Sequence, residues 1–212
     1  MIMKKIMFND RYGLTRKVLS GYKTQTRRII PDIEIDWVRR GKVHLPVGGY
    51  EDGVLFMDVR SILHDAGISD YVAPAKYQPK YEKGEEVAVA QSYRSVVEQD
   101  PDNDYGNYYV KQFRYTPGWT NKMFVRPDLM PHRIKITDIR LQRLYNISDE
   151  DCLCEGVYFY NCGIDTGFKV HGIRGTFSSA REAFAELIDK ISGKGTWQRN
   201  PWVFIYEFEL IK

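Results

Sequence analysis

Residues 202–211 read WVFIYEFELI, and this stretch decides the fold class. In a strand, alternate side chains share one face. The even positions from Trp202 to Leu210 are all apolar, and the other face carries Glu207 and Glu209 beside three apolar side chains: Val203, Ile205 and Ile211. Apolar residues on both faces predict a strand that is mostly buried within a sheet.

A second long strand is expected at residues 132–144. Ile134 and Ile136 share one parity along the chain, whereas Ile139 has the other. A regular strand would point these side chains to opposite faces of the sheet. The change of phase therefore predicts a bulge near residues 137–138.

Three short helices are expected, each with a capping residue at its start and a glycine at its end. These pairs are Asp10 and Gly21, Ser148 and Gly156, and Ser179 and Gly193. The second and third helices also carry a capping-box pattern, which Asp151 and Glu182 complete.

Expected strands outnumber expected helices. They do not alternate regularly with helices, as they would in a parallel βαβ fold. The sequence therefore predicts a protein of the α+β class, mainly β: a small antiparallel or mixed barrel with two or three flanking helices. A single domain is expected to span residues 1–212. Three turn-rich segments are interpreted as loop or hairpin insertions, at about 31–79, 94–121 and 157–177.

The composition is that of an ordinary globular protein, with 43% hydrophobic and 28% charged residues. A net charge of +3 is too small to coat nucleic acid, so such a role would depend on a local pocket or groove. Three cysteines argue against a secreted disulfide scaffold. No segment has the pattern of a signal peptide or a membrane span, which predicts a cytoplasmic protein without a membrane partner.

One polar segment could carry chemistry: residues 21–28 read GYKTQTRR. It places an amine, two hydroxyls and two guanidiniums directly after the stop of a helix. The residue types alone favour the interpretation that this segment is an exposed basic strand at the edge of a sheet. Lys23 and Thr26 have opposite parity, so they converge only if the chain bends between them, for example where the helix exit turns into the strand.

This segment resembles the G-x-K-x-x-T-x-R signature of the ASCH family, matched at Gly21, Lys23, Thr26 and Arg28. Further motifs follow in family order outside the insertions: YEKGEEV at 81–87, MP and RI within 130–134, ISDED at 147–151 before Glu155-Gly156, and NPWV at 200–203. The ordered set is similar to the longer members found in phages and prophages. The resemblance implies a PUA-like β-barrel that handles RNA or nucleosides.

One bacterial branch of that family is an amidohydrolase that removes the acetyl group from N4-acetylcytidine. Carried over by motif, its proton acceptor falls on Lys23, its nucleophile on Thr26 and its proton donor on Glu155. Four residues of the segment are also expected to bind a ligand: Gly21, Thr24, Arg27 and Arg28. Arginines such as Arg27 and Arg28 often bind a phosphate or a base edge. No cofactor and no metal is expected.

These residue types suit the reaction. A threonine hydroxyl becomes a nucleophile when a neighbouring neutral amine takes its proton. Repulsion from Arg27 and Arg28 would lower the pKa of Lys23 and so favour the neutral amine. Glu155 closes the second helix, where the negative end of the helix dipole favours a protonated carboxylic acid.

Other interpretations stay open. The same pocket would serve a non-catalytic module that binds RNA or a modified base, and the insertions would suit a phage or mobile-element protein that binds another protein. Glu155 can equally be a solvated helix end, and Lys23 the partner of an ion pair. Trp202 and Tyr206 are more typical of a core than of a stacking platform. The cysteines and His171 lack the usual zinc-knuckle spacing.

Overall fold

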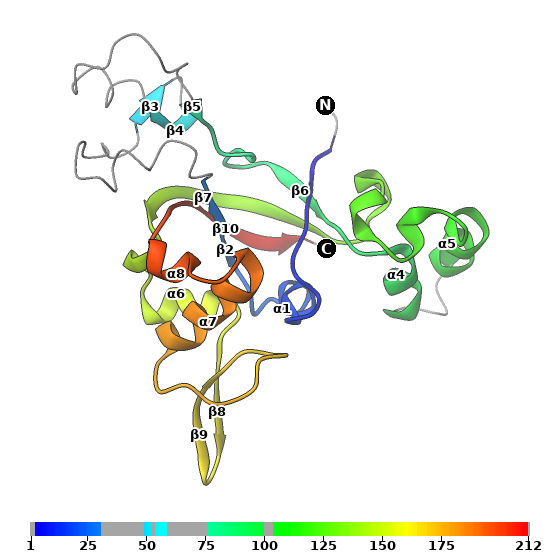
Figure 1. The fold of residues 1–212 in the computed structure, drawn as a ribbon. Coiled ribbons are helices and arrows are strands. Elements are labelled where there is room, and N and C mark those ends of the chain that lie inside the picture. Colours follow the sequence, from blue (N-terminus) through cyan, green and yellow to red (C-terminus); the bar gives the residue numbers. More distant parts are fainter. Residues whose placement is uncertain (1–2, 31–48, 52–53, 59–75, 100–103, 212) are drawn as a thin grey trace.

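The computed structural model describes residues 3–30, 49–51, 54–58, 76–99 and 104–211. Its main feature is a five-stranded mixed sheet with the strand order β1-β6-β7-β10-β2 (Figure 1). β1 pairs in parallel with β6, and the other three pairs are antiparallel. The strands are β1 (Lys5–Ile6), β6 (Glu86–Val89), β7 (Arg133–Arg143), β10 (Trp202–Ile211) and β2 (Gln25–Ile29). The α+β class is therefore confirmed.

The two long strands meet the sequence predictions closely. β10 lies between β7 and β2 and is buried from Trp202 to Tyr206. Along β7, Asp138 pairs with Glu207 and Ile136 pairs with Phe208, so Thr137 has no partner in the register. This extra residue is the predicted bulge, and it returns the apolar side chains on both sides of it to the same face.

The sheet has two edges, β1 and β2, and no strand ladder among the described residues closes them into a barrel. A side chain joins the edges instead. The Nη2 atom of Arg28 in β2 donates a hydrogen bond to the carbonyl oxygen of Met7, one residue after β1, at 2.7 Å. The sheet is therefore curved, with an open seam between its edges.

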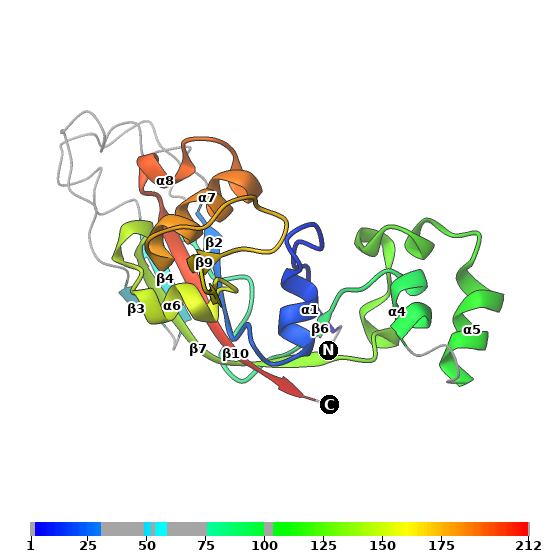
Figure 2. The same ribbon diagram turned by 90° about the horizontal axis from the view of Figure 1, so that it is seen from below.

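Four helices pack beside the sheet, and two more lie at the opposite end of the molecule (Figures 1 and 2). The four are α1 (Leu14–Leu19), α6 (Asp149–Cys154), α7 (Ala180–Ser192) and α8 (Thr196–Arg199). α7 buries Phe184, Leu187 and Ile188 in the main core, together with β10. Burial of this apolar face, rather than helix propensity alone, stabilises a helix of that length.

The predicted caps are right for α6 and α7. The hydroxyls of Ser148 and Ser179 each accept a hydrogen bond at 3.1 Å from the backbone N–H three residues later. The predicted cap of α1 is wrong, because that helix starts after Gly13 without a side-chain cap. Asp10 instead accepts a hydrogen bond from the Thr15 hydroxyl and pairs with Lys122 at 2.8 Å.

The segment expected as an insertion at 94–121 is helical rather than a loop or hairpin. It contains most of α4 (Tyr93–Gln99) and all of α5 (Asp104–Phe113), followed by short 3-10 turns. The Tyr93 ring stacks on Tyr109 and Phe113, with ring centroids 5.4 and 4.2 Å apart. Tyr109 and Phe113 are four residues apart, so one face of α5 meets α4. With these two, six described helices replace the predicted two or three.

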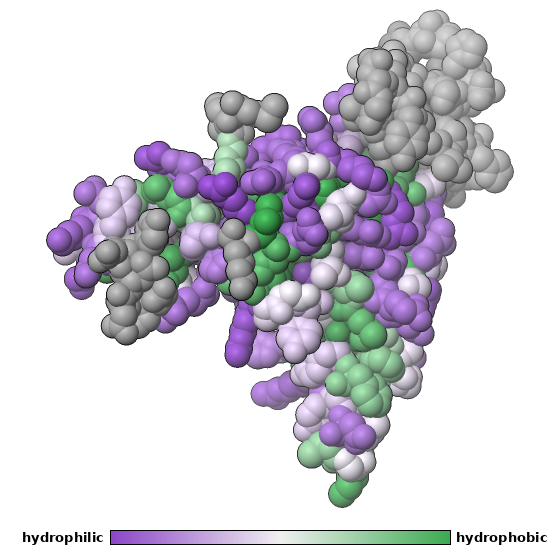
Figure 3. All heavy atoms as spheres, turned by 180° about the vertical axis from the view of Figure 1, so that it is seen from behind, coloured by the Kyte–Doolittle hydropathy of each residue, from purple (hydrophilic) through white to green (hydrophobic). Residues whose placement is uncertain are grey.

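The segment at 157–177 contains a hairpin, β8 (Tyr158–Cys162) and β9 (Asp165–Lys169), which projects away from the sheet (Figure 1). Apolar side chains continue along the hairpin to its tip (Figure 3), where Ile164 is fully exposed. Within 31–79 the structure describes a small sheet, β3 (Gly49–Glu51), β4 (Val54–Asp58) and β5 (Lys76–Tyr77). The rest of this expected insertion, 31–48, 52–53 and 59–75, lies outside the described residues.

None of the helices in the described ranges combines the length and the apolar character that crossing a membrane requires.

Candidate functional site

Lys23 lies between α1 and β2, where the chain turns sharply. Gly21 adopts a φ of 76°, and the backbone N–H of Lys23 donates to the carbonyl oxygen of Lys17 at 3.0 Å. This turn sends the Lys23 side chain into the protein, where only 1% of it is exposed. Its ammonium group has three acceptors: the Gln25 carbonyl at 2.6 Å, the Glu155 carbonyl at 2.8 Å and the Glu155 Oε2 at 2.6 Å.

Glu155 is the residue that ends α6, as the sequence predicts. Its carboxylate lies between two cations, because Oε1 also accepts a hydrogen bond from Arg27 Nη1 at 3.0 Å. Arg27 is 0% exposed at its side chain and Glu155 6%, so this is a buried ion cluster. The sequence predicted only the helix end beside Glu155, whereas the structure adds two cations that donate hydrogen bonds to its carboxylate.

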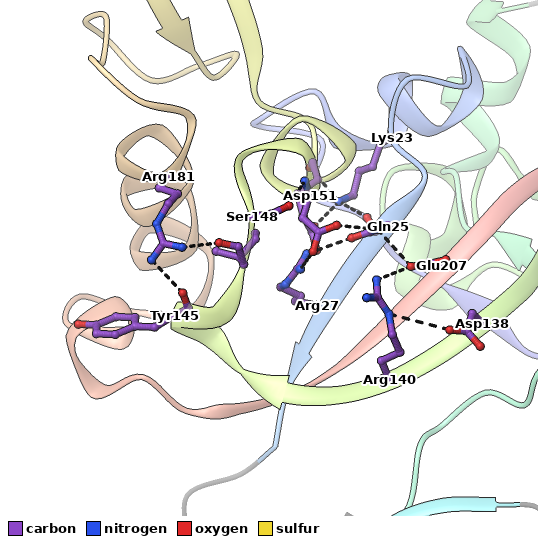
Figure 4. A network of polar contacts seen from close by, with 12 residues as sticks. Lys23, Gln25, Arg27, Asp138, Arg140, Tyr145, Ser148, Asp151, Arg181 and Glu207 are labelled. Atoms are coloured by element: carbon purple, nitrogen blue, oxygen red, sulfur yellow. Dashed lines mark hydrogen bonds and ion pairs between the residues drawn. The ribbon is translucent and has the colours of Figure 1, made fainter. Parts of the chain in front are cut away.

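A second carboxylate, Asp151, completes the charge balance of the cluster. Its Oδ2 accepts a hydrogen bond from Arg27 Nη2 at 2.6 Å, and its Oδ1 accepts one from the Gln25 amide at 3.0 Å. Gln25 also donates to Glu207 Oε1 at 3.3 Å, which links the cluster to β10 (Figure 4). Two cations and two carboxylates therefore meet where β2 faces α6.

Burial is the main influence on the lysines of this region. It lowers the pKa of Lys23, while the Glu155 carboxylate opposes that change and the Arg28 and Arg27 guanidiniums reinforce it. The neighbouring Lys17 has its pKa lowered to about 8, first by burial and then by repulsion from Lys23. The direction for Lys23 agrees with the sequence argument, but burial rather than arginine repulsion is the larger cause.

A pocket of about 180 Å³ opens beside this cluster, in the seam between the two sheet edges. We call it the lysine pocket. Lys23, Thr26 and Glu155, the three predicted catalytic residues, all line it. The remaining lining residues include two predicted ligand-binding residues and apolar side chains of α1 and α7: Arg27, Arg28, Leu14, Phe184, Leu187 and Ile188.

The opposite parity of Lys23 and Thr26 is resolved as the sequence argument requires. β2 begins at Gln25, so Lys23 precedes the regular strand and its side chain is free of the strand alternation. Thr26 is 6% exposed, and its hydroxyl makes no hydrogen bond to the described residues. The side chain of Thr26 is therefore free to contact a ligand in the lysine pocket.

Two predicted ligand-binding residues lie elsewhere. Gly21 is exposed at the turn after α1. Thr24 connects α6 and β10 through its backbone, with its N–H on the Cys154 carbonyl at 3.1 Å and its carbonyl on the Phe208 N–H at 2.9 Å. Neither Gly21 nor Thr24 is among the described residues that line the lysine pocket.

Sequence reasoning missed the roles of Gln25 and Asp151. Asp151 was interpreted only as part of a capping box. A usable signal was present, because Asp151 and Glu155 are four residues apart and therefore share one face of α6. Two carboxylates on one helix face predict a basic partner, and Arg27 is that partner.

The cysteines take no part in the cluster. Burial raises the pKa of the Cys152 thiol to about 12, while Cys154 is half-buried and Cys162 is exposed. Within the described ranges, no group of three or more histidine, cysteine, aspartate or glutamate side chains is arranged to hold a metal ion. Trp202 and Tyr206 are buried core residues, as predicted.

In comparisons with known proteins, no family model, no curated protein and no solved structure matches this chain.

Proposed function

We propose that this protein is an ASCH-type amidohydrolase that acts on an N4-acylated cytidine, in free form or within RNA, with Thr26, Lys23 and Glu155 as its catalytic residues. One observation carries the proposal. Three residues selected by motif, two of them 132 positions apart in the sequence, line one pocket, and two of them form a direct hydrogen bond.

The reaction follows from the roles of these groups. The Thr26 oxygen attacks the acyl carbonyl carbon while its proton passes to the Lys23 amine. The bond between that carbon and N4 of the base then breaks, and N4 takes a proton from Glu155. Water hydrolyses the resulting ester on Thr26, which releases the carboxylic acid and restores the hydroxyl.

The resting ion pair can supply both required protonation states. Lys23 Nζ and Glu155 Oε2 are 2.6 Å apart, so a proton can pass directly along this hydrogen bond. Transfer from the ammonium to the carboxylate leaves a neutral amine and a neutral acid, which are the base and the acid of the reaction. Burial promotes this transfer from Lys23, because desolvation lowers the pKa of its ammonium group.

The size of the lysine pocket limits what it holds. Pockets that enclose a whole drug-sized ligand measure roughly 300–1,000 Å³. At about 180 Å³, the lysine pocket suits a base with its acyl substituent, with the sugar lying outside. The Nε–H of Arg27 is buried and has no acceptor among the described residues.

The curved sheet is compatible with a PUA-like barrel, which we include in the proposal. The two edge strands are bridged by Arg28, and Phe8, just after β1, packs in the core against Phe208 of β10 with ring centroids 5.6 Å apart. A barrel with one unpaired seam would place the lysine pocket at that seam.

The test is hydrolysis of N4-acetylcytidine by the purified protein, followed by chromatography of cytidine and acetate. Thr26→Val should abolish turnover, because it removes the nucleophile and keeps the shape of the side chain. Thr26→Ser should retain turnover, and Glu155→Gln and Lys23→Met should lose at least a hundredfold in kcat. Lys83→Ala, an exposed lysine outside the pocket, is the matched control. Turnover that survives Thr26→Val would refute the mechanism.

One feature favours a second candidate, a non-catalytic module that binds a modified base. All three protons of the Lys23 ammonium already have acceptors, which stabilises the charged form. This candidate predicts binding of N4-acetylcytidine without turnover by the wild-type protein. Calorimetry on the same preparation separates it from the enzyme.

A further inference from the structure

A second pocket lies directly beside the lysine pocket and shares part of its wall. It measures about 340 Å³, and we call it the tyrosine pocket. Met7, Arg28 and Ile29 line both pockets. Its remaining lining residues come from β1, the end of β2, β10 and the chain before β6: Lys5, Ile30, Gln78, Lys80, Tyr81, Phe204 and Tyr206.

Three cations gather at the tyrosine pocket: Lys5, Arg28 and Lys80. Among the described residues that line it, none is a carboxylate. The cations are close enough to act on one another, because repulsion from Lys80 adds to burial in lowering the pKa of Lys5. An anion placed between them would relieve this repulsion.

Each cation has donors left for a ligand. Lys5 uses two of its three protons, on the carbonyls of Met123 and Val125 at 2.6 and 2.7 Å. The Arg28 guanidinium has one hydrogen bond in the described structure, to the Met7 carbonyl. The Lys80 ammonium lies 5.4 Å from the centre of the Tyr81 ring and has no carboxylate partner in the described ranges.

The pocket also has a rigid aromatic wall. Tyr81 and Tyr206 meet edge to face with centroids 5.3 Å apart. Their hydroxyls are held by the backbone, since Tyr81 donates to the Lys5 carbonyl at 2.9 Å and Tyr206 accepts from the Lys80 N–H at 2.8 Å. These contacts fix the chain that carries Lys5 and Lys80, so the cations are positioned before a ligand arrives.

We propose that the tyrosine pocket binds the phosphate group of a nucleotide whose base occupies the lysine pocket. The inference rests on the proposed function, and it narrows the substrate from a nucleoside to a phosphorylated nucleotide, either free or as a residue of RNA. Arg28 lies between the two pockets and contacts both parts of the ligand.

The experiment measures dissociation constants by calorimetry for four probes: N4-acetylcytidine, its 5′- and 3′-monophosphates, and a trinucleotide with N4-acetylcytidine at its centre. We expect at least one phosphorylated probe to bind about tenfold more tightly than the nucleoside. Lys80→Ala should remove this gain. Lys83→Ala, in the same turn but outside the pocket, should keep it. A free nucleotide is the ligand if a monophosphate binds most tightly, and RNA is the ligand if the trinucleotide does.

A fifth probe separates this inference from the proposed function. Ribose 5-phosphate has no base, so its binding does not depend on the lysine pocket. We expect it to bind the wild-type protein severalfold more tightly than Lys80→Ala. If ribose 5-phosphate binds in this way while N4-acetylcytidine is neither bound nor hydrolysed, the phosphate site stands and the proposed function falls. If the nucleoside is hydrolysed but phosphate gives no gain, or the gain survives Lys80→Ala, the phosphate site is refuted.

Discussion

A buried ion cluster is costly unless each charge has a partner. Here Lys23 and Arg27 are matched by Glu155 and Asp151, and the carboxylate of Glu155 touches both cations. Only Asp151 keeps noticeable contact with solvent, at 20% exposure of its side chain. Glu155 is therefore the residue whose loss leaves most charge uncompensated.

We expect Glu155→Ala to lower the free energy of unfolding by about 3–5 kcal/mol, because two buried cations lose their shared partner. Urea denaturation followed by circular dichroism measures this change. Glu186→Ala is the matched control, since Glu186 pairs with Lys190 on the surface and an exposed pair contributes about 0–1 kcal/mol. Equal losses in the two variants would contradict the description of the cluster as buried. Activity should therefore be tested with Glu155→Gln, which keeps the shape of the side chain.

Lys17 gives a prediction of pH dependence. Its pKa is about 8 in the folded protein, against a usual value of 10.5 in the unfolded chain. Between these values the unfolded chain holds a proton that the folded protein has released, so stability rises with pH. We expect the free energy of unfolding of the wild-type protein to rise from pH 7.5 to 9.5 relative to Lys17→Met. Lys83→Met controls for the loss of a surface charge. A wild-type protein and a Lys17→Met variant with parallel pH profiles would refute the prediction.

Among the elements, the bulge in β7 joins two halves of one strand that have opposite parity. Without Thr137, one half of β7 would turn its apolar side chains away from the core. We expect deletion of Thr137 to cost more than about 4 kcal/mol, a loss typical of a broken core. Thr137→Ala should stay within about 0.5 kcal/mol of the wild type, because this side chain is exposed. Thermal unfolding of the two variants distinguishes the backbone effect from the side-chain effect.

Sequence patterns predicted correctly those features that depend on residues close together in the chain. The caps at Ser148 and Ser179 and the parity change along β7 depend on residues within a few positions of each other. The helices α4 and α5 were missed because contacts between Tyr93 and Phe113, twenty positions apart, stabilise them. The cap at Asp10 failed for a similar reason, since Thr15 and Lys122 bind that carboxylate instead.

At the scale of the whole molecule, the site depends on contacts that no local pattern contains. Lys23 and Glu155 were grouped by the ASCH resemblance alone, and the fold brings them to 2.6 Å. Asp151 follows from helix spacing once Glu155 is known. Of the three cations at the tyrosine pocket, only Arg28 belongs to a motif, and Lys5, Lys80 and Arg28 come from three separate parts of the chain. Only the curvature of the sheet places them together.

The distribution of charge leads to a last prediction, on salt dependence. The net charge is only +3, so RNA bound at the tyrosine pocket should meet three cations rather than a broad basic surface. For single strands, each neutralised phosphate contributes a slope of about −0.7 to log K against log salt, so the one phosphate in the tyrosine pocket gives about −0.7. We therefore expect the dissociation constant of a short single-stranded RNA to rise roughly twofold to threefold between 50 and 200 mM salt. Titrations at several salt concentrations measure the slope, and Lys80→Ala should bring it closer to zero. A slope near zero would exclude phosphate contacts, and a slope beyond about −5 would show that RNA binds across a much larger surface than this pocket.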